Sequence, residues 1–191
     1  MKISLPWIVL PAGIVSAWKA MTAYSPEHPE IHDKIINAAD RYFVIGVQEP
    51  TTYCGLVDVT KCPEGSSTLV NDNLTNLASA MPGGQNIFVD KMGHVSYTLP
   101  HSTYRPPGAQ IGGFYSCRLL TDCAPPVTVL SWESYDGENG LWACPVDPDT
   151  PVSIKATLKA SVKDFKGSGC LKVEGIKLSD AGDDFAAWAY M

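Results

Sequence analysis

Stretches rich in glycine, proline and acidic turn residues interrupt this 191-residue chain at short intervals, and they leave room only for short secondary-structure elements. They include "RPPGAQIGG", "SYDGENG", "PVDPDTP" and "SDAGDD". The runs between them are rich in β-branched and aromatic residues, and "VSIKATLKASVKDF" alternates apolar with polar residues, as a strand with one solvent-exposed face does. This pattern predicts an all-β fold, an antiparallel β-sandwich or a jelly-roll-like barrel with few short helical turns.

The segment 18–40 is expected to be irregular, because Pro26 and Pro29 break any long helix and leave at most a helical turn or two in residues 31–39. Gly83 and Gly84 could open a phosphate-binding loop, but no helix with a Lys-Ser/Thr pair follows them. An Asp-x-x-Gly turn beginning at Asp90 instead predicts a β-hairpin. Strands are expected at residues 41–48, 68–71, 87–90, 94–99, 127–132, 141–144, 152–160, 171–178 and 185–190.

The first residues, "MKISLPWIVLPAGIVSA", have the order of a secretory signal peptide. Lys2 is followed by an apolar stretch too short to span a bilayer, and small residues up to Ala17 suit a cleavage site. An ordinary buried N-terminal strand is the alternative. We therefore expect a signal peptide at residues 1–17, a single secreted β domain at residues 18–191 and no membrane anchor.

Six cysteines form an even set, which favours disulfides in an oxidising, extracellular location. Their spacing does not suit a zinc site, and no metal or cofactor is expected. Two short loops would pair Cys54 with Cys62 and Cys117 with Cys123, which leaves Cys144 with Cys170, although the sequence alone leaves other connectivities open. Asn73, in the polar stretch "NDNLTN", begins an N-glycosylation sequon.

The net charge of −6, with 14 lysines and arginines that form no run, excludes nucleic acid and an anionic membrane as the main partner.

Histidine and serine motifs do not suggest a catalytic site. His28 and His32 have a zinc-like spacing, but Pro29 stands where a metalloprotease has glutamate, so we expect loop histidines. His101 precedes Ser102, yet no nucleophile elbow surrounds the serine, and adjacent side chains of an extended chain point apart.

The clustered carboxylates and the tryptophans also fit structural roles better than catalytic ones. The carboxylates of "WESYDGENG" and "SDAGDD" are expected in turns, with a glycosidase pair or a weak calcium site as alternatives. The tryptophans are expected in the core rather than on a sugar-stacking surface. We expect no catalytic residue and no enzymatic activity. The carboxylates concerned are Glu133, Asp136, Glu138, Asp180, Asp183 and Asp184, and the tryptophans are Trp132, Trp142 and Trp188.

An ordered series of short motifs resembles the PhiA-like cell-wall proteins of fungal phialide development and their IgE-binding allergen relatives. No single motif is specific, but the series covers nearly the whole mature chain. It comprises Ser25-Pro26, Ile31-His32, Asn37-Ala38-Ala39, Thr52-Tyr53-Cys54, Cys62-Pro63, Pro82-Gly83-Gly84-Gln85, Ile87-Phe88-Val89-Asp90, Gly93, His101-Ser102, Pro107-Gly108, Ala143-Cys144-Pro145, Cys170 and Ala186-Ala187-Trp188-Ala189-Tyr190.

The resemblance implies an extracellular, glycosylated, non-catalytic protein of the fungal wall or culture fluid. It supports the pairs Cys54–Cys62 and Cys144–Cys170, and it makes Cys117 and Cys123 an addition to the pattern. The expected partner is cell-wall polysaccharide. The alternative is a secreted effector or allergen-like protein that binds a host protein or glycan, and the oligomeric state stays open.

Overall fold

The computed structural model describes residues 17–120, 125–147, 149–182 and 184–191. The described residues form strands and one short 3₁₀ helix, which confirms the predicted all-β class. The elements in chain order are β1 (Trp18–Tyr24), β2 (Ile36–Ala39), β3 (Tyr42–Ile45), β4 (Thr52–Tyr53), η1 (Val59–Lys61), β5 (Leu69–Val70), β6 (Asn76–Leu77), β7 (Gln85–Val89), β8 (Val95–Tyr97), β9 (Phe114–Leu119), β10 (Val127–Trp132), β11 (Leu141–Pro145), β12 (Ala156–Ala160), β13 (Leu171–Val173), β14 (Gly175–Gly182) and β15 (Ala189–Tyr190).

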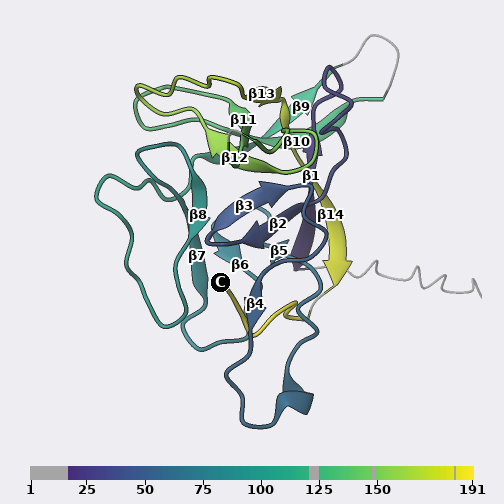
Figure 1. The fold of residues 1–191 in the computed structure, drawn as a ribbon, viewed down its shortest axis with the longest axis vertical. Helices are drawn as coiled ribbons and strands as arrows, with labels where there is room; N and C mark the ends of the chain where they lie inside the picture. The colour runs from purple at the N-terminus through teal and green to yellow at the C-terminus, as the bar shows by residue number, and fades with distance from the viewer. Residues whose placement is uncertain (1–16, 121–124, 148, 183) are drawn as a thin grey trace, which may run out of the picture.

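The main sheet is antiparallel and curls on itself, in the manner of a sandwich or barrel (Figure 1). Its strand order is β13-β11-β12-β3-β8-β7-β6-β5-β1-β14-β10-β9, with β2 paired to β3. Strand β7 connects the part of the sheet from β13 to β8 with the part from β6 to β9, because it pairs with β8 on one side and β6 on the other. A small second sheet pairs β15 with β4.

The structure corrects the prediction for residues 18–40. This segment is not irregular, because β1 pairs along its whole length with β14 and β2 pairs with β3. A turn, rather than a helix, leads from Ile31 toward β2. Strand β9 was also absent from the expected set, and the segments predicted at residues 152–160 and 185–190 are strands only in β12 and β15. The signal peptide expected at residues 1–17 lies, except for Ala17, outside the described residues.

A continuous apolar core fills the curled sheet, with Trp132 fully buried at its centre. The Trp132 Nε1–H donates to the Ser161 carbonyl at 2.9 Å, and the Phe114 ring meets its indole edge-on at 5.0 Å. The indole therefore buries its large apolar area without leaving its polar group unpaired. Trp142 and Trp188 are only partly buried, so the expected core position holds in full for Trp132 alone.

The predicted hairpin is present, and Gln85 explains the Pro-Gly-Gly-Gln motif that precedes it. Gly83 and Gly84 adopt positive φ angles in the turn that leads into β7. The fully buried Gln85 amide then donates to the carbonyls of Thr98 and Tyr190 and accepts from the Tyr190 N–H. One side chain thus fixes the C-terminal strand to the β7–β8 hairpin.

Two disulfides close the structure, Cys54–Cys62 and Cys144–Cys170, and these are pairs expected from the sequence. Cys117, on β9, forms no disulfide with another described cysteine. Because Cys123 lies outside the described residues, its expected pairing with Cys117 stays a prediction.

Candidate functional site: a lysine-lined cleft

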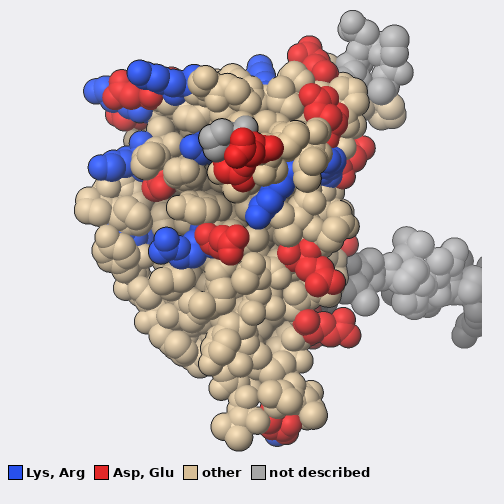
Figure 2. All heavy atoms as spheres, viewed as in Figure 1, with Lys and Arg blue, Asp and Glu red and all other residues tan. Residues whose placement is uncertain are grey.

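A cleft of about 680 Å³ opens between the β7–β8 turn, the end of β11 and the β12–β13 connection. We call it the lysine cleft, because four of its lining residues are lysines: Lys91, Lys159, Lys163 and Lys166. Its volume falls within the range of ligand-binding pockets. Figure 2 shows Lys and Arg side chains, with acidic side chains among them, at the upper left of the molecule, where Figure 1 draws the β12–β13 connection, whereas acidic side chains predominate along the right-hand edge.

The four lysines of the cleft have no ion pair with a carboxylate in the part of the chain that the structure describes. Three lysines elsewhere do have them: Lys19 contacts Asp180 and Asp72, Lys61 contacts Asp58, and Lys177 contacts Asp33. The other described lysines outside the cleft, Lys34, Lys155 and Lys172, have none. Four lysines without an ion-pair partner in the described chain therefore lie around one hollow of an otherwise acidic protein.

Neither acidic residue of the cleft forms an ion pair with its lysines. Asp147 closes its own turn, because its carboxylate accepts from the Thr150 hydroxyl and from the N–H groups of Asp149 and Thr150. The hydrogen bond from the Thr150 hydroxyl is the main reason that the pKa of Asp147 lies below its usual value, and Lys155, which does not line the cleft, adds to it. Asp164 is the other acidic residue of the lining.

An aromatic side chain and apolar atoms line the rest of the cleft. Phe165 is partly exposed, and its ring centroid lies 5.9 Å from that of Trp142. Trp142 is itself held by a 2.9 Å hydrogen bond from its Nε1–H to Ser161 Oγ. The Cys144–Cys170 disulfide also belongs to the lining. The cleft therefore combines a fixed aromatic ring with several cationic groups.

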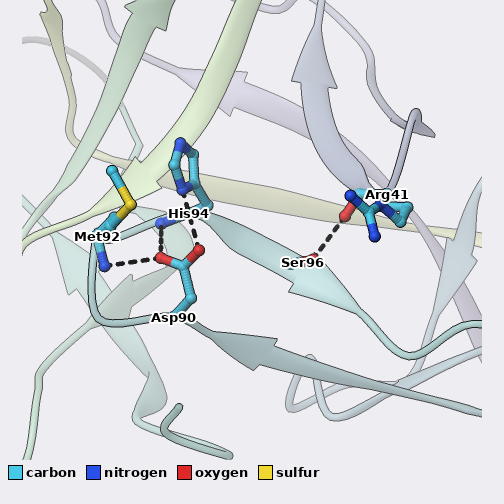
Figure 3. A network of polar contacts seen from close by, with 5 residues as sticks. All are labelled: Arg41, Asp90, Met92, His94 and Ser96. Carbon is cyan, nitrogen blue, oxygen red and sulfur yellow. Dashed lines mark hydrogen bonds and ion pairs between the residues drawn. The ribbon is translucent and has the colours of Figure 1, made fainter. Parts of the chain in front are cut away.

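The β7–β8 turn forms the wall that carries Lys91, and Asp90 holds this turn in shape (Figure 3). The Asp90 carboxylate accepts from the N–H groups of Met92 and His94 and lies 3.0 Å from His94 Nδ1. Burial raises the pKa of Asp90, but these hydrogen bonds from His94 and Met92 outweigh it and hold the pKa below its usual value. Ser96 points away and donates to the Arg41 carbonyl, so His94 has no nucleophile beside it in this view.

A second hollow of about 340 Å³ continues the cleft, since both are lined by Lys91, Val162, Lys163 and Asp164. It contains Tyr135 and Asp136 from the β10–β11 hairpin. Glu133 and Glu138 lie in the same hairpin but do not line this hollow, and Ser134 Oγ accepts from the N–H groups of Asp136 and Glu138. These carboxylate-bearing residues thus shape a turn, as expected for the stretch "WESYDGENG".

The remaining candidate residues serve local structure. Ser25 N–H donates to His32 Nδ1, and the Tyr24 ring meets His32 edge-on, so this histidine packs in a loop. Ser102 Oγ accepts from the Tyr104 N–H. The described residues contain no group of three potential ligands that could hold a metal ion. Of the "SDAGDD" carboxylates, Asp180 pairs with Lys19, and Asp183 lies outside the described residues.

The sequon lies at the tip of the β5–β6 hairpin, where Asn73 is exposed. The Thr75 hydroxyl donates to Asn73 Oδ1 at 3.0 Å, and fully buried Leu74 anchors the turn between them. The Asn73 side chain is therefore accessible from solvent, as a glycosylation site must be.

The fold and the cleft together define an all-β, disulfide-stapled protein with an open, lysine-lined cleft. The chain is 30% identical over 171 residues to an "uncharacterized secreted protein" of Arthroderma benhamiae, a match that covers 89% of this chain and 84% of that relative. This chain belongs to the same family as that protein. No protein-family model matches the chain, and no solved structure matches it. None of the helices in the described residues is long and apolar enough to cross a membrane.

Proposed function

We propose that this is a non-catalytic, secreted protein of the fungal cell wall, which binds wall polysaccharide through the lysine cleft and supports wall or conidial development. The observation that carries the proposal is the set of four lysines without carboxylate partners around one open cleft. The secreted fungal relative supports extracellular location, and the ordered series of PhiA-like motifs supports the wall as the place of action.

The geometry favours binding over catalysis. A glycosidase needs two carboxyl groups on opposite sides of a bond, one of them a proton donor. In the hollow beside the cleft, Asp90 is occupied by three hydrogen bonds from its own turn, and its lowered pKa keeps it ionised. It is therefore poorly suited to donate a proton at neutral pH.

Cell fractionation tests the proposal. The tagged protein is produced in a filamentous fungus, and its amount is measured in the medium and in wall extracts made with hot detergent, reductant and glucanase. We expect retention in the wall until glucanase or reductant treatment. The variant Lys163→Glu/Lys166→Glu should move to the medium, whereas Lys61→Glu/Lys172→Glu, with the same change in net charge but outside the cleft, should stay. Equal retention of both variants would remove the cleft from wall binding.

A second candidate function, a secreted effector that binds a host protein, is favoured by one exposed apolar loop. The loop closed by Cys54–Cys62 projects at the bottom of Figure 1. Val57 in this loop is fully exposed, Val59 is 70% exposed, and the adjacent Tyr53 is 55% exposed. Exposed apolar side chains that gather on one projection are a feature of protein-binding sites.

The same fractionation separates the two candidates. Nearly complete recovery of the protein in the medium would favour the effector. Binding to host protein extracts should then be lost in Val57→Ser/Val59→Ser and retained in Lys163→Glu/Lys166→Glu. Wall retention that is unaffected by the valine substitutions would argue against this second candidate.

A further inference from the structure

We propose that the ligand of the lysine cleft is an acidic glycan, a sugar chain whose pyranose rings bear carboxylate or phosphate groups. This inference rests on the proposed function, because it names the ligand class of the same cleft. The inference goes beyond the proposed function because it excludes neutral glucans and chitin as ligands of the cleft.

The charge of the cleft requires an anionic ligand. Lys91, Lys163 and Lys166 are exposed and Lys159 is half-buried, so all four ammonium groups can reach the opening. No carboxylate of the described chain forms an ion pair with them, and the two acidic residues of the lining, Asp147 and Asp164, offset only part of the charge of four lysines. A ligand with several negative groups relieves the repulsion among the lysines, and a neutral sugar does not.

The aromatic lining favours a sugar ring over a simple polyanion. The Phe165 ring centroid lies 5.9 Å from that of Trp142, and the Phe165 N–H donates to the Val162 carbonyl at 2.9 Å, which fixes the backbone of this turn. The partly exposed ring offers a flat apolar face, against which the C–H face of a pyranose can pack. An acidic peptide has carboxylates, but it lacks a rigid apolar face like the C–H face of a pyranose.

The second hollow, which continues the cleft, gives room for an oligosaccharide chain rather than a single sugar. The second hollow carries Tyr135, which is 79% exposed and whose hydroxyl donates to the Ile111 carbonyl at 2.9 Å. Lys91 and Lys163 border both hollows. Aromatic residues at the two ends, with shared lysines between them, suit an extended oligosaccharide whose charges recur along its length.

Titration calorimetry on the purified, disulfide-intact protein tests the inference. The probes are oligogalacturonic acid for the carboxylate source and phosphomannan for the phosphate source. The controls are the fully methyl-esterified oligogalacturonide, which has the same rings without charge, and polyglutamate, which has the charge without rings. We expect binding to at least one acidic glycan, weakening as salt is added, and much weaker binding to both controls.

Variants assign the binding to the cleft. Lys163→Glu/Lys166→Glu should weaken the affinity at least about tenfold, and Lys61→Glu/Lys172→Glu should change it little. Phe165→Leu should weaken glycan binding while leaving residual polyglutamate binding unchanged. Near-ultraviolet circular dichroism confirms that each variant is folded.

Several results would overturn the inference. The protein could bind neither acidic glycan, or it could bind the esterified probe or polyglutamate as tightly as the acidic glycans. Full affinity of the variant Lys163→Glu/Lys166→Glu for the acidic glycans would also overturn it. None of them decides the proposed function, because wall retention is measured separately by fractionation. Retention in the wall without binding to acidic glycans would refute only the ligand class, whereas cleavage of the oligosaccharide would contradict the non-catalytic proposal.

Discussion

Asp90 and His94 close the β7–β8 turn through a 3.0 Å contact between Asp90 Oδ2 and His94 Nδ1, with the two side chains only 17% and 18% exposed. The second carboxylate oxygen, Oδ1, accepts from the N–H groups of Met92 and His94. The tilted ring of Tyr42 packs 4.9 Å from the imidazole. This pair fixes the turn that presents Lys91 to the cleft, and its contribution to stability should depend on pH.

Asp90→Asn should lower the free energy of unfolding by about 1–2 kcal/mol at neutral pH, because the charge-assisted hydrogen bonds are lost. The folded pKa of Asp90 lies below its unfolded value, so its contribution is full above the ordinary aspartate pKa and disappears as the pH falls through the folded pKa. Urea unfolding at neutral and strongly acidic pH should therefore show the wild-type advantage shrinking with acid. Asp136→Asn, at an exposed carboxylate, is the control, and an advantage that persists in acid would contradict this account.

The two disulfides should contribute unequally. Cys144–Cys170 closes a loop with a sequence separation of 26, against 8 for Cys54–Cys62, and Cys144 is buried. Loop-closure entropy predicts a loss of about 3.5 kcal/mol for Cys144→Ala/Cys170→Ala and about 2.5 kcal/mol for Cys54→Ala/Cys62→Ala. Equilibrium denaturation of the two variants measures both values. The reverse order would show that the projecting loop stabilises the fold more than its exposure indicates.

Asn73 should carry an N-linked glycan when the protein is secreted, because its amide is exposed and its sequon hydroxyl already hydrogen-bonds to it. Asn73→Gln should then remove a single mobility shift on electrophoresis, the same shift that an endoglycosidase removes from the wild type. Asn76→Gln, which lies in the same hairpin outside any sequon, should leave the shift in place. An identical mobility of wild type and Asn73→Gln would show that the site is not used.

The fold class, the β7–β8 hairpin and the core position of Trp132 could be predicted because their signals are local. Turn residues at short spacing and β-branched runs report directly on strands. Strand β1 could not, since four of the seven residues of "WKAMTAY" are lysine, alanine or methionine, and the segment becomes a strand by pairing with β14, far along the chain. Strand β9 likewise depends on its pairing with β10.

The lysine cleft could not be predicted either, because its charges are scattered in sequence. Lys91 belongs to the β7–β8 turn, whereas Lys159 lies near the end of β12 and Lys163 and Lys166 follow it. A backbone hydrogen bond of 2.7 Å from the Ala160 N–H to the Gly93 carbonyl brings the two segments together. The chain has no basic run, yet the fold brings four scattered lysines to one cleft.

The contact between Gly93 and Ala160 can be tested by substituting two glycines with similar backbone angles. One substitution adds only backbone strain, and the other adds strain and a steric clash. Gly93 has φ +83° and Gly83 has φ +90°, so alanine is strained at both. At Gly93 a Cβ would also lie 2.4 Å from the Ala160 carbonyl oxygen, whereas at Gly83 it would meet no atom within 4 Å. Gly83→Ala should therefore destabilise the protein by about 1–2 kcal/mol through backbone strain alone.

Gly93→Ala should destabilise it by at least about 2 kcal/mol more, because the β7–β8 turn must separate from β12 to make room for the methyl group. Urea unfolding of both variants measures the difference. Since the same separation moves Lys91 away from Lys159 and Lys163, Gly93→Ala should also reduce wall retention, while Gly83→Ala should not. Equal effects of the two substitutions on stability would show that the close approach of Gly93 to Ala160 is not what joins the walls of the cleft.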